Sequence, residues 1–343
     1  MIFYLVRADH DYTMRRYLAS WGRAFRRRVQ ILPYEHCRSL RESPTGTYIF
    51  SDIERLDASQ RAAAARLRER LLERGARVLN DPIRTLRRFD LLRALRERGV
   101  NSHGAWRVAE GASPEHFPVF IRGENDHDGS LTPLLATRAE METAVDELVA
   151  RGRRREDLIV VEFCDTSDAS GIFRKYSVQI VADRVLPRHL FFGRRWMLKA
   201  AELGDAALLA EERQYMAENP HQEAMRQACT LAGLEYGRVD YGVDRDGATR
   251  VWELNTNPML VTHELHGVNW LRIEVHAAFA ERFGAALHAI DMPAGPPIPL
   301  PPLPELPDAL PPRPSLRRRL GRWVRGLPDW AHYYWYKLLG ARR

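Results

Sequence analysis

The chain has 343 residues, of which 45% are hydrophobic and 28% charged, values typical of a globular protein and not of a disordered one. That length is enough for two or three lobes. The formal net charge is +7, but the segment 315–343 holds eight Lys/Arg and one acid, so residues 1–314 carry no net charge. The charge of residues 1–314 therefore does not favour binding to a polyanion, and we expect no nucleic-acid partner.

The three cysteines are far apart, at Cys37, Cys164 and Cys229, and form no CxxC pair. This spacing predicts a reducing compartment and no structural zinc. The apolar run near the N-terminus is too short for a signal peptide, and no stretch approaches the ~20 apolar residues of a membrane-spanning helix. We expect a cytoplasmic protein.

The first segment alternates strands and a helix. Short apolar strands are predicted at 2–6, 48–51 and 76–80, and Asp57 is a suitable cap for a helix that runs to Arg74 and stops at Gly75. Because a strand, a helix and a strand in succession form a parallel pair, residues 1–83 predict a parallel α/β domain.

A second block mixes strands and helices in a different order. Helices are predicted at 89–99, 138–152, 207–232 and 271–290, and strands at 117–123, 158–163 and, as an antiparallel pair, 173–192. From 293 to 314 eleven of 22 residues are proline, which predicts an extended spacer without packed elements. The expected domains are 1–83, 84–292, the linker 293–314 and a tail, 315–343.

The stretch GRVDYGVDRDGATRVWELNTNP, residues 237–258, predicts a β-hairpin around Asp246-Gly247. If residues 245–248 form its loop, Asp240 lies opposite Glu253 and Arg238 lies opposite Asn255. Side chains alternate with period two, so these four would share one face. The other face would hold Val239, Tyr241, Trp252 and Leu254.

Two carboxylates in directly opposed positions repel each other unless a cation lies between them. A hard divalent ion such as Mg²⁺ takes carboxylate and amide oxygens and keeps phosphate oxygens as further ligands. Asp240, Glu253 and Asn255 supply that ligand set, and Arg238 adds a charge suited to a phosphoryl oxygen. The alternative is an exposed hairpin with a solvated polar face.

The pattern R-x-D … E-x-N, with the ordered elements before it, resembles the ATP-grasp superfamily over about residues 75–260. The resemblance implies a parallel N-terminal domain and two α+β lobes that hold ATP between them, with Mg²⁺ (or Mn²⁺) as the metal. It implies phosphate contacts from Arg88 and Arg122, and an adenine-binding hinge near 162–165. The hinge residues are Glu162, Phe163 and Cys164.

Other positions are implied less directly. Arg174 and Arg238 match arginines near the reacting phosphoryl group, Lys199 could reach a phosphate, and Asp165 or Asp168 could bind ribose or simply form an Asx-turn. His263 could touch a substrate or be structural. The chain departs from the family at three places: arginine replaces the usual lysine at Arg88 and Arg122, Lys175 and Ser177 replace an acid and an arginine, and the glycine-rich flap is reduced to NDHDGS, residues 125–130.

The resemblance implies a ligase that activates a substrate carboxylate with ATP for attack by an amine, with small molecules or peptides as the two partners. Two alternatives stay open: a kinase that phosphorylates a hydroxyl, and a degenerate fold that serves as a binding or scaffold protein. The metal site would be the same in the ligase and in the kinase.

The tail combines helical spacing with basic and aromatic side chains. Leu316, Leu320 and Trp323 recur on one face, arginines fill the rest, and Trp330 to Tyr336 adds further aromatics. A basic amphipathic helix of this kind predicts peripheral binding of residues 315–343 to an anionic membrane surface. A helix that docks on a protein is the alternative.

Overall fold

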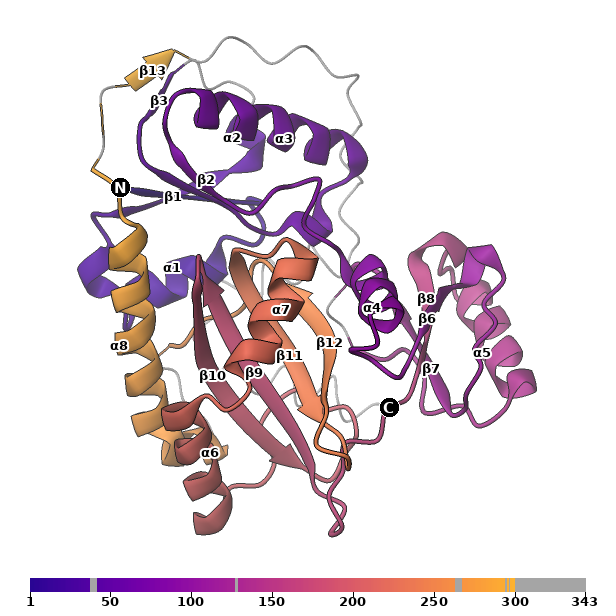
Figure 1. Ribbon diagram of the computed structural model, residues 1–343. Coiled ribbons are helices and arrows are strands. Elements are labelled where there is room, and N and C mark those ends of the chain that lie inside the picture. Colours follow the sequence, from indigo (N-terminus) through magenta and orange to yellow (C-terminus); the bar gives the residue numbers. More distant parts are fainter. Residues whose placement is uncertain (38–41, 127–128, 263–266, 294, 296, 300–343) are drawn as a thin grey trace. The chain divides into compact units, whose positions relative to one another are not determined.

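The N-terminal part of the computed structural model is a parallel sheet in the order β2-β1-β4-β5 (Figure 1). The structure describes residues 1–299 except 38–41, 127–128, 263–266, 294 and 296. These residues belong to one compact unit, Met1–Leu303. The four strands are β1 Ile2–Val6, β2 Val29–Pro33, β4 Thr47–Phe50 and β5 Arg77–Leu79, so the predicted parallel sheet is present.

Helices cover both faces of this sheet. The helix α3, Ala58–Glu73, begins with a capping box in which Asp57 accepts from the Gln60 amide at 2.8 Å, and Gly75 follows its end with a φ of 78°. Leu67 and Leu71 of α3 pack on the face that carries Phe3 and Phe50. The helices α1, Tyr12–Ala19, and α8, Ile273–Ile290, cover the opposite face, and the short helix α2 is Tyr34–Cys37.

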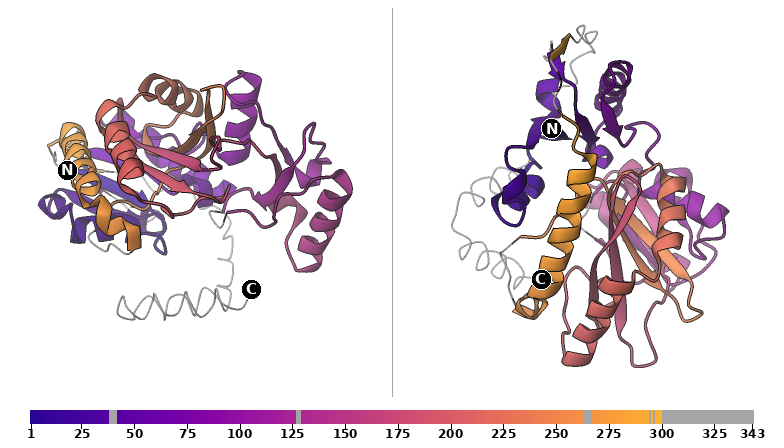
Figure 2. Two further views of the ribbon diagram at one scale, coloured as in Figure 1. Left: turned by 90° about the horizontal axis from the view of Figure 1, so that it is seen from below. Right: turned by 60° about the vertical axis from the view of Figure 1, so that its left-hand side comes forward.

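A smaller antiparallel sheet has the order β6-β8-β7, and α5 packs on it (Figures 1 and 2). Its elements are β6 Ala105–Arg107, β7 Val119–Gly123, α5 Arg138–Ala150 and β8 Leu158–Glu162. The helix α4, Arg88–Glu97, contacts both β6 and the large sheet described next, so it lies beside the two lobes. The predicted class, a parallel α/β domain followed by two α+β lobes, is therefore confirmed.

The large sheet is antiparallel, in the order β10-β9-β11-β12. Its strands are β9 Phe173–Val181, β10 Arg184–Gly193, β11 Tyr236–Val243 and β12 Thr249–Asn255. The single helix predicted at 207–232 is wrong: α6 is Ala206–Glu218 and α7 is Gln222–Ala232. Asn219 takes a left-handed φ of 47°, and Pro220 has no N–H to continue the helix.

The predicted hairpin register is correct at the four polar residues and wrong nearer the turn. Asp240 pairs with Glu253 and Arg238 with Asn255, but the register shifts after Asp240, so that Tyr241 pairs with Val251. The shift is a β-bulge, which adds one residue to β12. Val251 consequently joins the core, and Trp252, predicted on the face opposite the four polar residues, borders the same pocket as they do.

The proline-rich segment also differs from the prediction. Residues Pro297–Pro299 form β13, which pairs with β3, Glu42–Pro44. The backbone of proline is compatible with an edge strand, where its missing N–H is tolerated. The rest of the predicted linker, the tail and His263 lie outside the described residues. Among the described helices none has the length and apolar character to cross a membrane.

Candidate functional site

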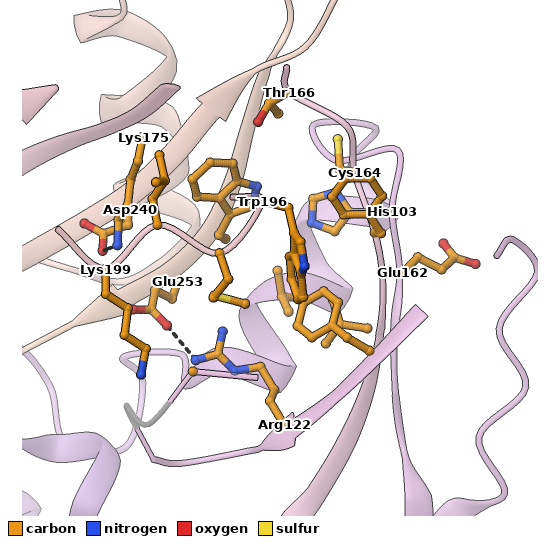
Figure 3. A pocket seen from close by; sticks show the side chains of 18 of the residues that line it. His103, Arg122, Glu162, Cys164, Thr166, Lys175, Trp196, Lys199, Asp240 and Glu253 are labelled. Carbon is orange, nitrogen blue, oxygen red and sulfur yellow. Dashed lines mark hydrogen bonds and ion pairs between the residues drawn. The ribbon is translucent and has the colours of Figure 1, made fainter. Parts of the chain in front are cut away.

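A pocket of about 240 Å³ lies between the large sheet and the smaller one (Figure 3). The large sheet contributes charged side chains from three strands, and the smaller lobe contributes Arg122 and the segment 161–164. The loop after β10 closes a third side with residues 196–199. The predicted residues that line this pocket are Arg122, Glu162, Phe163, Cys164, Lys199, Arg238, Asp240, Glu253 and Asn255.

Asp240 is buried and has two basic partners. Its Oδ2 lies 2.7 Å from Nζ of Lys175, and its Oδ1 accepts from Nε of Arg238 at 2.9 Å. The Ser177 hydroxyl donates to Oδ1 as well, at 2.8 Å. Burial by itself would raise the pKa of Asp240, but Arg238 and Lys175 outweigh it and hold that pKa below its ordinary value. Asp240 is therefore ionised at neutral pH.

Glu253 also has two basic partners, Arg88 at the start of α4 and Arg122 on β7. Nη2 of Arg88 lies 2.7 Å and Nη2 of Arg122 lies 2.9 Å from the same oxygen, Oε2. Nη1 of Arg88 donates to the carbonyls of Gly123, Glu124 and Asp126 at 3.0, 3.0 and 2.6 Å. Arg88 thus links the large sheet to the end of β7. Burial lowers the pKa of Arg122, although Glu253 acts in the opposite direction.

The donor set suits a hard divalent cation. Asp240 and Glu253 present carboxylate oxygens from directly paired positions, and Asn255 adds an amide oxygen one pair further along. Among the described residues there is no group of three His, Cys, Asp or Glu side chains that could hold a metal. Two carboxylates and an amide would therefore need phosphate or water oxygens to complete a coordination shell. The four basic partners supply the charge that such phosphates require.

Glu162, at the end of β8, has a structural role beside the pocket. Its side chain is only 2% exposed and lies apart from the other labelled side chains in Figure 3. It accepts from the amides of Gly104, Glu115 and His116 at 2.8–2.9 Å and from Arg96 at 3.3 Å. These bonds fix the strand that carries Phe163 and Cys164 along the pocket wall.

The side of the pocket formed by residues 161–164 is apolar and aromatic. The ring of Trp196 lies 4.9 Å from that of Phe120 and 5.8 Å from that of Phe163. Leu92 and Val161 line the same pocket, as does His103. Burial lowers the pKa of His103 to about 4, so this imidazole is neutral near pH 7. A flat uncharged ring system would fit this side, whereas anions would fit the opposite side.

Three of the predicted residues, Arg174, Asp165 and Asp168, do not line this pocket. Arg174 is on β9 next to Lys175, and side chains alternate, so Lys175 faces the pocket while Arg174 binds Asp168 and Glu211 at 2.6 Å each. Asp165 accepts from the Ser167 amide at 2.9 Å, the Asx-turn alternative. Asp168 makes the same kind of turn with Ser170.

Sequence reasoning missed Lys175, Ser177, Trp196 and Trp252. The first two could have been found by extending the alternation of β9 from its pairing with Asp240, had that pairing been known. Trp252 faces the pocket only because of the bulge, and the hydrophobic pattern gives no signal for it. Trp196 is in a loop whose conformation no periodicity predicts.

Beyond the pocket, the end of β12 is fastened to the N-terminal domain. Oδ1 of Asn257 accepts from the Tyr4 hydroxyl at 2.8 Å and from Thr13, and its amide donates to the carbonyl of His10 at 3.1 Å. Its backbone N–H donates to Oδ1 of Asn255 at 2.8 Å. Asn257 therefore orients Asn255 and joins two domains.

No family model matches the sequence, and no curated protein does. Among solved structures, the chain is similar to the D-alanine–D-alanine ligase from Bacillus anthracis complexed with ATP, with a TM-score of 0.47 and 13% identity over 84% of this chain and 97% of that one. It is also similar to the ATP-grasp ligase PsnB complexed with a phosphomimetic variant of its minimal precursor, Mg and ADP. There the TM-score is 0.45 and the identity 15%, over 81% of this chain and 97% of that one.

Proposed function

We propose that this protein is an ATP- and Mg²⁺-dependent ligase, which activates a substrate carboxylate as an acylphosphate for attack by an amine. The observation that supports this most is the pairing of Asp240 with Glu253 beside a pocket that is cationic at one end and aromatic at the other. In this proposal ATP lies between the lobes, with the adenine at residues 162–164 and the phosphates at the basic end.

Each residue has a role that its contacts support. Arg88, from α4, and Arg122, from the small lobe, would exchange Glu253 for phosphate oxygens, because a guanidinium binds either group. Arg238 and Lys175 would stabilise charge on the transferring group from the other side. Lys199, which also borders the pocket, would add a third cation. Asp240, Glu253 and Asn255 would hold the metal, whose contribution is to neutralise phosphate charge.

The proposed reaction needs no nucleophilic side chain. A carboxylate oxygen of the substrate attacks the γ-phosphorus, and the bond from that phosphorus to the β,γ-bridging oxygen breaks, so that ADP leaves. The amine nitrogen then attacks the acyl carbon, inorganic phosphate leaves with the acyl oxygen, and the amine proton passes to solvent. Both steps depend on positioning and charge neutralisation more than on acid–base catalysis.

The test is ADP release by the full chain with Mg²⁺ across a panel of amino acids and short acidic peptides and their N-acetylated forms, which have no free amine, with and without an added amine. A ligase releases ADP only when both a carboxylate and an amine are present, and a covalent product appears by mass spectrometry. ADP release with a hydroxyl substrate and no amine would identify the kinase instead.

One observation favours the second candidate, a binding protein on a degenerate site. Both arginines that replace the family's lysines already bind Glu253. Calorimetry separates the two proposals, because a ligase must bind ATP together with Mg²⁺. An absence of heat with Mg²⁺ and ATP would favour the binding protein.

A further inference from the structure

A second polar cluster lies on the large sheet, away from the pocket described above. It brings together side chains from β10, the turn Gly267–Arg272 that precedes α8, and α8 itself. Its members are Arg188, His189, Arg272 and His276, with Phe191 and Phe279 beside them. The guanidinium of Arg188 lies 4.6 Å from the ring of Phe279, one helical turn from His276.

Five side-chain nitrogens of this cluster have no partner among the described residues. Arg188, His189 and His276 are 8%, 4% and 7% exposed. Nε of Arg188 and both ring nitrogens of each histidine make no hydrogen bond within the described part of the chain. A buried polar group without a partner costs free energy comparable to a lost hydrogen bond. Several such nitrogens in one cluster therefore indicate that a ligand binds there.

The charge of the surroundings indicates the sign of that ligand. Arg272 is paired with Glu212 at 2.5 and 2.6 Å, and Asp240 is shared by Lys175 and Arg238. Among the described residues, four basic groups, counting Arg188, thus face two carboxylates, which leaves an excess of two positive charges. Burial, with Arg272 and Arg238 nearby, lowers the pKa of Arg188 to about 9, and burial lowers that of His276 to about 3. An anion would relieve both shifts.

The cluster is aligned with the proposed phosphate site. His189 pairs directly with Ser177, Ser177 with Asp240, and Asp240 with Glu253, so one row of side chains crosses all four strands on one face. Neighbouring strands are about 4.8 Å apart, which places His189 roughly 10 Å from Asp240 along the row. A molecule held at Arg188 could therefore extend along the sheet towards Arg238 and Asp240.

We propose that Arg188, with His189 and His276, binds a second, non-reacting carboxylate of the substrate, so that the activated substrate is an amino diacid or an acidic peptide. This inference rests on the proposed ligase function. Arg188 supplies charge and paired donors, and the two imidazoles supply N–H donors to the same group. The remaining carboxylate would then face Arg238, at the end of the row where ATP is proposed to bind.

Specificity is the first test. The full chain is assayed for ADP release with L-glutamate and glutamyl peptides against L-glutamine and the glutaminyl counterparts, which lack the second carboxylate. Wild type is expected to prefer the acids by about ten-fold or more in kcat/KM, and Arg188→Met to lose that preference while ATP affinity stays within two-fold. Arg188→Lys keeps the positive charge and should retain part of the preference for the acids. Arg184→Met, an exposed change on the same strand, is the matched control.

Binding without turnover is the second test. Glutarate is added to the full chain carrying labelled histidine, and the imidazole signals of His189 and His276 are followed by NMR, assigned with His189→Asn and His276→Asn. Both signals should move in wild type and in Arg184→Met but not in Arg188→Met. Movement without any ADP release from the panel would support the carboxylate site and refute the ligase. ADP release with an acid preference that survives in Arg188→Met, His189→Asn and His276→Asn would overturn the site and leave the ligase standing. Signals that do not move in wild type would also overturn it.

Discussion

The two ends of one row on the large sheet differ in how their charges are satisfied. At Asp240 and Glu253 every carboxylate already has two basic partners, drawn from both lobes. At Arg188 and His189 the burial is similar, but ring nitrogens and a guanidinium nitrogen have no partner among the described residues. The first end is complete in the absence of ligand, whereas the second end is not.

This difference teaches what each end requires. Where the protein supplies its own counter-ions, a ligand must exchange with them, and binding is expected to depend on a metal ion and a polyanion together. Where no counter-ion is supplied, a ligand adds new bonds and need not displace any. Mutations should therefore act differently at the two ends.

The largest effect is expected from Asp240→Asn combined with Glu253→Gln. ADP release should be abolished, because the carboxylate ligands of the proposed metal are gone. The contacts also predict a loss of stability, since four basic side chains lose their buried counter-ions, and breaking a buried pair costs about 3–5 kcal/mol.

Calorimetry sharpens the result of that double variant. Nucleotide binding should lose its dependence on Mg²⁺, while binding of ATP without metal persists, because the cations remain. Asp246→Asn in the exposed turn of the same hairpin is the control. Full turnover in the double variant would show that the metal assignment is wrong.

The next effect concerns Arg88 and Arg122, the two arginines that bind Glu253. Arg88→Ala and Arg122→Ala should each weaken ATP binding by about ten-fold or more, as expected for a lost charged contact. Arg88→Ala should also destabilise the protein more than Arg122→Ala, because Arg88 holds three carbonyls at the end of β7. Arg88→Lys should keep part of the affinity for ATP but lose most of the hydrogen bonds to these carbonyls, because a lysine has no planar fork of donors.

Equilibrium binding and chemical denaturation of the same samples measure both quantities. Arg98→Ala, an exposed change just after α4, is the control. Unchanged nucleotide affinity in both alanine variants would favour the degenerate site. It would also show that the phosphates of ATP do not bind at Arg88 and Arg122.

A smaller effect is expected at the hinge. Glu162→Gln should lower the free energy of unfolding by about 3 kcal/mol, because a buried carboxylate that accepts three amide hydrogen bonds and faces Arg96 becomes neutral. ATP affinity at saturating Mg²⁺ should change little, since the side chain points away from the pocket. Urea denaturation and nucleotide titration check the two parts, and Glu156→Gln, on the exposed turn before β8, is the control. A loss of ATP affinity without a loss of stability would instead place the Glu162 side chain in direct contact with the nucleotide.

The sequence predicted the strands, the parallel N-terminal sheet and the pairing of Asp240 with Glu253, because turn residues and alternation are local signals. It did not predict what depends on distant contacts. The bulge that turns Trp252 to the pocket, the selection of Lys175 over Arg174, and the arginines on Glu253 all depend on how separate segments meet. The break at Asn219-Pro220 has a local signal in the sequence, because proline has no N–H to continue a helix. His189 gave no signal because the strand pairing that aligns it with Asp240 is not encoded locally.

The smallest effect is one of pH, and it compares the histidines of the two ends. Burial lowers the pKa of His103, in the pocket, to about 4, below the ~6.5 of an unfolded chain. Between these values the unfolded state binds a proton that the folded state does not, so stability is fully present above pH 6.5 and is lost as the pH falls towards 4. His103→Gln removes this histidine. It should reduce the loss in the free energy of unfolding by about 2 kcal/mol at pH 5 and by almost nothing at pH 7.5. Urea denaturation at several pH values measures this difference in stability.

Glutarate should lessen the loss of stability at low pH that comes from His276, because a carboxylate at Arg188 raises the pKa of His276. It should leave the part of that loss that comes from His103 unchanged. If glutarate lessened the contributions of His103 and His276 equally, the pocket and the cluster at Arg188 would not differ in the way their contacts indicate.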